Sequence, residues 1–184
     1  MNEMHKNRIY LTGFMGSGKS TIGPILANVL GWNFSDLDKL IEKDLGDSVT
    51  NIFAAHGELY FREKERELLH QSTTEENIVL SLGGGTLTTK QNREIIKKTG
   101  ISIYLKSSPE EIFRRLKYKV DRPLLKSENG EPLSVFETKN KISELLHKRE
   151  PTYLQADIVY QVDNISVGKT VDDLIKLIER KLHK

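Results

Sequence analysis

The sequence predicts an α/β fold with helices flanking a parallel β-sheet, and three observations support this prediction. Short runs rich in β-branched residues alternate along the chain with segments of helical periodicity, as in successive βαβ units. A glycine-rich segment directly follows the first of these runs, and a second glycine cluster follows a later one. The 184 residues match the size of one domain with its own core, so we assign residues 1–184 to a single domain.

Five segments have the length and the composition of β-strands. They are Arg8–Thr12, Trp32–Ser35, Ile78–Leu82, Ile101–Leu105 and Ile158–Val162. Because helical patterns separate them, consecutive strands are expected to be joined by crossover helices and to run parallel in one sheet.

Apolar spacing and end signals predict helices between these strands. The first follows the glycine-rich segment, has apolar residues at i, i+3, i+4, i+7 and i+8, and ends at Gly31. Its stripe consists of Ile22, Ile25, Leu26, Val29 and Leu30. Ser108–Glu111 predicts a capping box with proline at the first helical position. A closing helix is predicted from the stripe Val171, Leu174, Ile175, Ile178 and Leu182.

Charge and composition exclude several classes of protein. Lys plus Arg number 28 and Asp plus Glu number 26, so the net charge is +2. This charge is too small to indicate binding to nucleic acid or to an acidic membrane. The absence of cysteine excludes disulfides, thiolate zinc sites and cysteine nucleophiles. No apolar run is long enough to span a bilayer and no signal peptide follows Met1, so we expect a soluble cytoplasmic protein. We also predict a monomer, although no pattern in the sequence indicates the oligomeric state.

The segment GFMGSGKSTIG, Gly13–Gly23, matches the phosphate-binding loop pattern, with Gly13, Gly18, Lys19 and Ser20 at the required spacing. Glycines let backbone N–H groups approach phosphate oxygens, and the following helix adds the positive end of its dipole. Lys19 can reach the β- and γ-phosphates, and the Ser20 hydroxyl can bind Mg²⁺. The alternative is a chance glycine-rich turn, but the strand before and the helix after favour nucleotide binding.

Two other classes of nucleotide-binding protein fit poorly. A GTPase needs an Asn-Lys-x-Asp motif, whereas here Asn140-Lys141 is followed by Ile142-Ser143. A motor or transport ATPase ends a second strand with an acidic residue, whereas Ile78–Leu82 continues into Gly83–Gly85. Bare backbone at the carboxyl end of a parallel strand favours a second small molecule bound there, and a tight turn is the alternative.

Asp36-Leu37-Asp38 supplies two acidic candidates after the second strand. In an extended segment residues i and i+2 point to the same side, so both carboxylates are expected to face one site. One could hold Mg²⁺ while the other accepts a proton from an attacking hydroxyl. The alternative is that one of them caps a helix over Leu37–Leu45.

Arg62 is the candidate for binding a carboxylate. Arg62, Glu65 and Leu69 share one helix face, so Arg62 is expected to be half buried and held by Glu65. A fixed guanidinium suits bidentate carboxylate binding, and a surface salt bridge is the alternative.

Val120–Glu137 interrupts the alternation of strands and helices. It contains two prolines, the dipeptide Asn129-Gly130 and little periodicity. A long connection of this kind in a compact domain is either a lid or a disordered loop.

Taken together, these segments resemble the shikimate kinase family. GFMGSGKSTIG, DLDKLIE, IFAAHGELYFREKE, LGGG, DRPLL and KREPTY occur in the order and approximate spacing of that family, from Ile9 to about Asp163. The resemblance implies a three-layer P-loop kinase fold with a five-stranded parallel sheet and a mobile lid over about residues 120–137. It also implies transfer of the γ-phosphate of ATP to the 3-hydroxyl of shikimate, a step toward aromatic amino acids.

The resemblance also implies a role for each candidate residue. The phosphates would be wrapped by Gly16, Ser17, Gly18, Lys19, Ser20 and Thr21. Mg²⁺ would be held by Ser20 and, through water, by Asp36. Arg122 would descend with the lid onto the transferred phosphate, and Arg115 would lie against the adenine.

Within a substrate-binding region of about residues 36–70, Asp38 would contact shikimate hydroxyls and act as the base. Arg62 and Arg149 would grip the carboxylate, and Gly83, Gly84 and Gly85 would pack against the ring. Two alternatives stay open, namely a kinase of another polyol acid such as gluconate, and a nucleotide-dependent switch without a second substrate.

Overall fold

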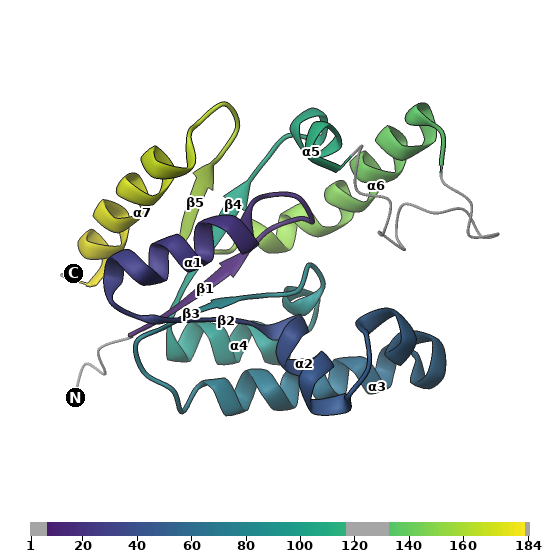
Figure 1. Ribbon diagram of the computed structural model, residues 1–184, viewed down its shortest axis with the longest axis horizontal. Coiled ribbons are helices and arrows are strands. Elements are labelled where there is room, and N and C mark those ends of the chain that lie inside the picture. Colours follow the sequence, from purple (N-terminus) through teal and green to yellow (C-terminus); the bar gives the residue numbers. More distant parts are fainter. Residues whose placement is uncertain (1–6, 117–132, 183–184) are drawn as a thin grey trace.

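The computed structural model describes residues 7–116 and 133–182 and contains a five-stranded parallel sheet (Figure 1). The strands are β1 Arg8–Thr12, β2 Asn33–Asp36, β3 Ile78–Ser81, β4 Ile101–Lys106 and β5 Ile158–Gln161. Their order in the sheet is β2-β3-β1-β4-β5. The α/β fold and all five predicted strands are therefore confirmed, and every strand end lies within one residue of its predicted position.

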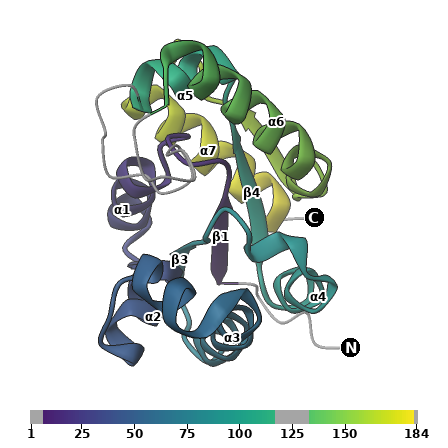
Figure 2. The same ribbon diagram turned by 90° about the vertical axis from the view of Figure 1, so that its right-hand side faces the viewer.

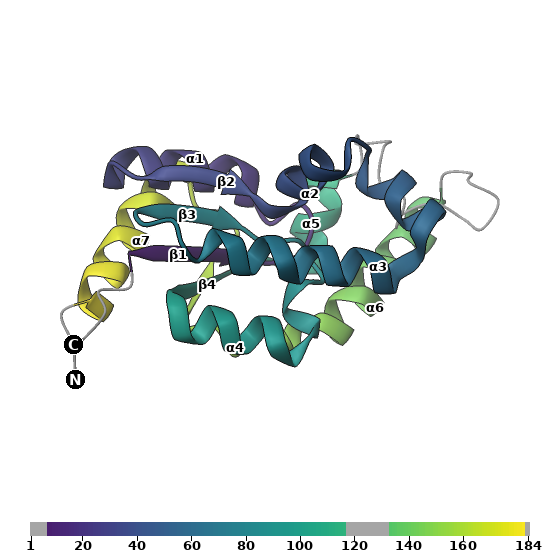
Figure 3. The same cartoon turned by 90° about the horizontal axis from the view of Figure 1, so that it is seen from below.

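Helices cover both faces of the sheet, which gives three layers. They are α1 Lys19–Leu30, α2 Leu37–Leu45, α3 Val49–Ser72, α4 Lys90–Thr99, α5 Pro109–Leu116, α6 Val135–Tyr153 and α7 Val167–Leu182, with a 3₁₀ turn η1 Thr86–Thr88. Figure 3 shows α1 and α4 on opposite sides of the sheet. Among the described helices, none combines the length and the apolar composition that crossing a bilayer requires.

Each face of the sheet has its own hydrophobic core. Ile9 and Leu11 of β1 point toward α1 and α7, whereas Tyr10 points to the opposite face, as the two-residue period of a strand requires. The first core contains Leu26 of α1 and Leu174 of α7. The second core is formed mainly with α2, α3, α4, α5 and α6, and it is the one that borders the site described below.

The buried face of α1 differs from the predicted stripe. Ile25 and Val29 are 41% and 57% exposed, and small residues take their place against the sheet. A Cβ on Gly23 would overlap the ring of Phe34 and lie 3.2 Å from Leu11, so this glycine lets α1 approach the strands closely. The prediction of a helix ending at Gly31 is confirmed, with Gly31 as a left-handed C-cap.

The ends of two further helices follow the sequence in part. Ser108 Oγ accepts from the backbone N–H of Glu111 at 3.3 Å, and Pro109 is the first residue of α5. The reciprocal half of the predicted capping box is wrong, because the Glu111 carboxylate pairs with the arginines of α5 instead. Three residues of the predicted α7 stripe, Val171, Leu174 and Ile178, are buried as expected.

The carboxyl ends of the parallel strands carry the segments singled out in the sequence. The glycine-rich loop follows β1, Asp36 ends β2, and Gly83–Gly85 follows β3. Seen from this side of the molecule, α2 and α3 lie on one side of β1 and α5 and α6 on the other (Figure 2). Side chains from both groups of helices can therefore meet at this edge of the sheet.

Candidate active site

The glycine-rich loop connects β1 to α1. Gly16 and Gly18 have φ of 80° and 104°, and Gly18 is the N-cap of α1, whose first N–H groups have no intrahelical acceptor. The Lys19 ammonium donates to the carbonyls of Gly13 at 2.7 Å and Phe14 at 3.2 Å, so it lies back over the loop. This geometry places a cation and a helix N-terminus together, as phosphate binding requires.

Arg115 lies against this loop. Its Nη1 donates to the carbonyl of Gly16 at 3.2 Å, and its Nε is held by Glu111 at 2.8 Å. The Arg115 side chain is 32% exposed, compared with 65% for Arg114, which also pairs with Glu111. Arg115 is therefore fixed beside the phosphate loop, and its contact with adenine stays a prediction.

Asp36 and Asp38 are arranged differently from the prediction. Asp36 has extended backbone, but α2 begins at Leu37, so the expectation of one extended segment is wrong. Oδ1 of Asp36 caps α2 by accepting from the N–H groups of Asp38 at 3.1 Å and Lys39 at 3.3 Å. The helix-cap alternative therefore applies to Asp36, and it leaves Asp38 in the first turn of α2 with its carboxylate directed elsewhere.

The Asp38 carboxylate lies over the backbone of Gly83. A Cβ on Gly83 would lie 2.6 Å from Asp38 Oδ1. Burial, together with the charges of Asp36 and Glu65, raises the pKa of Asp38 to about 6, against the opposing influence of Lys19 and Arg62. Asp38 is thus a carboxylate whose proton affinity is suited to general-base chemistry near neutral pH.

Arg62 is held by carboxylates on its own helix, as predicted. Its Nη1 donates to both oxygens of Glu65, at 3.1 and 2.9 Å, and the Glu65 side chain is fully buried. Glu65 also accepts from the Thr86 hydroxyl at 2.7 Å. Glu58, one turn before Arg62, accepts from its Nε and Nη2.

Arg149 approaches from α6 on the opposite side. Its guanidinium lies 6.0 Å from the ring centroid of Phe14 in the phosphate loop and next to Gly84, where an added Cβ would lie 3.0 Å from Nη1. Tyr153, one turn further along α6, donates its hydroxyl to the Gly84 carbonyl at 2.5 Å. Burial raises the pKa of Tyr153, so this hydroxyl remains a donor.

The three consecutive glycines therefore face three different functional side chains. Gly83 faces Asp38, Gly84 faces Arg149, and Gly85 faces Arg62, whose Nη2 an added Cβ would overlap. None of the three glycines is among the positive-φ residues of the described chain. Close approach of the side chains, rather than a tight turn, is what requires glycine at these positions. We call this group of Asp38, Arg62, Arg149 and Gly83–Gly85 the acid seat.

Several contacts of the acid seat were missed in the sequence, although spacing could have indicated two of them. Glu58 and Arg62, and likewise Arg149 and Tyr153, are i, i+4 pairs that share a helix face. The bond from Thr86 to Glu65 joins residues 21 positions apart, and no local pattern predicts it.

Part of the predicted lid lies outside the described residues, and so does Arg122. The irregular connection ends earlier than predicted, because Val135–Glu137 forms the first turn of α6. The role of this segment as a lid stays a prediction. Ser134 caps this helix in a capping box with Glu137, which fixes where α6 begins.

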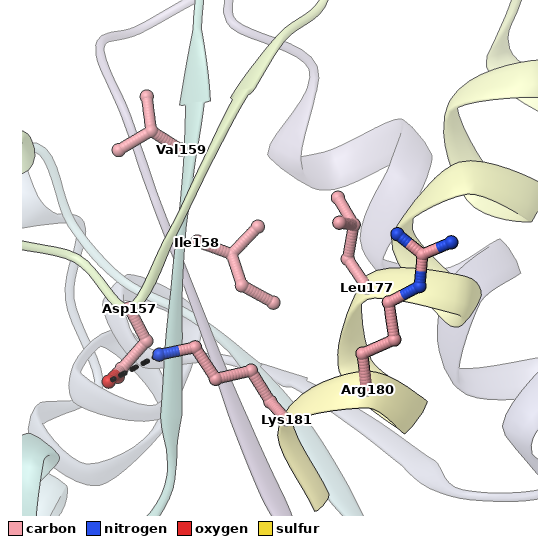
Figure 4. A pocket seen from close by; sticks show the side chains of 6 residues that line it. All are labelled: Asp157, Ile158, Val159, Leu177, Arg180 and Lys181. Carbon is pink, nitrogen blue, oxygen red and sulfur yellow. Dashed lines mark ion pairs between the residues drawn. The ribbon is translucent and has the colours of Figure 1, made fainter. Parts of the chain in front are cut away.

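A hollow between β5 and α7 is distinct from the acid seat (Figure 4). It is lined by Asp157, Ile158, Val159, Leu177, Arg180 and Lys181. Asp157 and Ile158 are at the amino end of β5, whereas the acid seat is built at the carboxyl ends of the strands. The hollow therefore contributes nothing to the arrangement described above.

The fold and the site define a P-loop protein in which two arginines and a carboxylate converge beside the phosphate loop, an arrangement that suits a small-molecule kinase. A sequence model of shikimate kinase matches residues 15–179. The chain is 48% identical to a shikimate kinase of Chlorobaculum parvum over 180 residues, 98% of this chain and 96% of that protein. The chain therefore belongs to the shikimate kinase family, and the resemblance stated from its motifs is confirmed.

Solved structures agree with this assignment. The shikimate kinase of Bacteroides thetaiotaomicron has a TM-score of 0.86 at 37% identity, covering 94% of this chain and 98% of that one. The shikimate kinase of Acinetobacter baumannii, solved in complex with shikimate, has a TM-score of 0.85 at 34% identity, covering 95% of this chain and 94% of that one. The predicted P-loop kinase fold is confirmed by these structures.

Proposed function

We propose that this protein transfers the γ-phosphoryl group of ATP to the 3-hydroxyl of shikimate, giving 3-phosphoshikimate and ADP in the synthesis of aromatic amino acids. The observation that carries this proposal is the convergence of Asp38, Arg62 and Arg149 on the backbone of Gly83–Gly85, next to the phosphate loop. Membership of the shikimate kinase family supports it.

The side chains of the acid seat are chemically complementary to a hydroxylated ring acid. Arg62 and Arg149 supply two guanidinium groups for one carboxylate, and paired N–H donors on a planar cation suit that geometry. The bare backbone of Gly83–Gly85 lets Asp38, Arg149 and Arg62 approach it closely, and the substrate ring would pack against these groups. Asp38 can accept hydrogen bonds from ring hydroxyls, because its carboxylate is ionised above pH 6.

In the reaction, Asp38 receives or orients the proton of the attacking 3-hydroxyl. Lys19 reaches the phosphates after leaving the loop carbonyls that it contacts in this structure. Phosphoryl transfer depends chiefly on positioning and on cations near the equatorial oxygens, so Lys19 stabilises the charge of the transferred group. Gly16–Thr21 wrap the phosphates, and Arg115 lies along the nucleotide. The resemblance to the family implies that Arg122, which lies outside the described residues, supplies a second cation to the transferred phosphate.

Mg²⁺ is the metal that this arrangement fits. Ser20 is exposed at the start of α1, and Asp36 caps α2 through Oδ1, so its Oδ2 could accept from a water ligand of the metal. The described residues contain no cluster of three His, Asp or Glu side chains suited to a metal ion. Mg²⁺ usually keeps several waters and is held largely by the substrate phosphates, so one hydroxyl and one carboxylate suffice. When bound, the metal neutralises the phosphate charge.

A coupled ADP-release assay across shikimate, quinate, gluconate and nucleoside monophosphates tests the proposal. We expect turnover with shikimate that exceeds that with every other acceptor, and loss of turnover when Mg²⁺ is chelated. Equal or faster turnover with gluconate would support the alternative polyol acid, which family membership does not favour. ATP binding without turnover on any acceptor would point to a switch protein.

A further inference from the structure

The guanidinium of Arg62 is already engaged on all three nitrogens by carboxylates of its own chain. Nε and Nη2 donate to Oε1 of Glu58 at 3.3 and 3.2 Å, and Nη1 donates to Glu65. Gly85 lies against the same group. The site that is expected to bind a substrate carboxylate therefore has a carboxylate in it before any substrate arrives.

A guanidinium binds a carboxylate with two parallel bonds along one of its edges. The edge formed by Nε and Nη2 is taken by Glu58, and the edge formed by Nη1 and Nη2 shares Nη1 with Glu65. A substrate carboxylate cannot form a bidentate pair along the Nε–Nη2 edge unless Glu58 leaves, and along the other edge it would share Nη1 with Glu65.

The two glutamates differ in how easily they can leave. The Glu58 side chain is 69% exposed, whereas the Glu65 side chain is 0% exposed and also binds Thr86. Releasing an exposed carboxylate into water costs little, because an exposed ion pair is weak. Releasing Glu65 would strand a buried charge, which is strongly unfavourable. The contact between Glu58 and Arg62 is therefore the one expected to break when a substrate carboxylate binds.

We propose that Glu58 is a displaceable internal ligand of Arg62, which competes with the substrate carboxylate and thereby sets the affinity of the acid seat. This inference rests on the proposed function, in which Arg62 binds that carboxylate. Before binding, Glu58 compensates the charge of Arg62 and holds it against Gly85. A carboxylate ligand replaces Glu58, whereas a ligand without a carboxylate leaves the Glu58–Arg62 pair intact.

Calorimetric titration of the full chain with shikimate and with its neutral methyl ester tests the competition. Glu58→Ala removes the competitor, and Glu63→Ala is the matched control, since Glu63 is an exposed glutamate of the same helix. We expect the Kd for shikimate to fall about two- to fivefold in Glu58→Ala, because this factor corresponds to the free energy of an exposed ion pair. The Kd of Glu63→Ala, and every Kd for the methyl ester, should stay at the wild-type value.

An unchanged or higher Kd in Glu58→Ala would overturn the proposal, and so would an equal fall in Glu63→Ala, which would indicate a general charge effect. A crystal structure with shikimate bound is a second measurement. Glu58 Oε1 within 3.5 Å of Arg62 Nε in that complex would also refute displacement. If Arg62→Ala binds shikimate as well as the wild type does, the assigned role of Arg62 fails and the competition with it. Failure confined to Glu58→Ala leaves the proposed function standing.

Discussion

Asp38 connects the structure of the site to the pH at which it works. Because its pKa is raised to about 6, the carboxylate is ionised at pH 7.5 and protonated at pH 5. A group that must accept or orient a proton acts only when ionised. We expect kcat/KM for shikimate to be flat above pH 7 and to fall about tenfold per pH unit below 6. A profile that stays level down to pH 5 would contradict this role.

Replacing Asp38 with asparagine should separate activity from stability. We expect turnover to collapse while ATP binding stays nearly intact, because the proposed nucleotide contacts lie on the phosphate loop. Stability should rise, since the folded-state pKa exceeds the unfolded value and the ionised Asp38 destabilises the fold at neutral pH. The expected gain at pH 7.5 is about 1–3 kcal/mol.

Urea unfolding at two pH values measures this gain. As pH rises from about 4 through 6, the folded state keeps a proton that the unfolded state has lost, so the wild type loses stability over this window. Asp38→Asn should lose less, and its advantage should therefore be smaller at pH 4.5 than at pH 7.5. Asp172→Asn, an exposed carboxylate of α7, is the control. An advantage that does not depend on pH would rule out this explanation.

At the scale of elements, the α3 helix depends on one residue. Gly57 has φ 80° and ψ 175°, a conformation open almost only to glycine, and it divides α3 into two helical segments. The second segment carries Arg62 and Glu65 and so sets their direction. No atom within 4 Å would meet a Cβ at Gly57, so only the backbone requires glycine.

Gly57→Ala should therefore cost about 1–3 kcal/mol in unfolding free energy and raise the KM for shikimate more than that for ATP. Gly168→Ala in α7 is a matched control, because it also has open space but no positive φ. That variant should be neutral or stabilised by up to about 1 kcal/mol, from helix propensity. Equal effects of the two substitutions on stability would argue against strain at Gly57.

Elements differ in how far the sequence predicts them. Strands and helix ends could be placed because β-branched runs, glycine stops and proline starts act locally. The buried face of α1 could not be predicted in full. Hydrophobic periodicity predicts that Ile25 and Val29 are buried, whereas Gly23 and Ala27 are the residues buried against the sheet. Small side chains allow α1 to pack closely against the sheet at these positions, but they do not contribute to the apolar periodicity from which a buried face is predicted. The bond between Thr86 and Glu65 could not be predicted for a different reason, because it joins residues 21 positions apart and depends on how η1 meets α3.

For the whole molecule, the predicted monomer and its cytoplasmic location stay predictions. A single chain can supply the acid seat and the phosphate loop, so we expect catalysis to proceed without a second subunit. We expect sedimentation equilibrium to give the chain mass of 21.0 kDa, and specific activity to be independent of protein concentration. Specific activity that rises with concentration would indicate an obligate assembly.

The three glycines that face Asp38, Arg149 and Arg62 have a consequence for how the protein tolerates substitution. Because none has a positive φ, side chains at these positions block the seat without preventing the backbone from folding. In a saturation library, cellular abundance should be retained at residues 83–85 while growth complementation is lost. At Gly57 both should decline together. The close approach of Asp38, Arg149 and Arg62 is thus encoded by three absent side chains, and we expect these positions to be required for activity and not for folding.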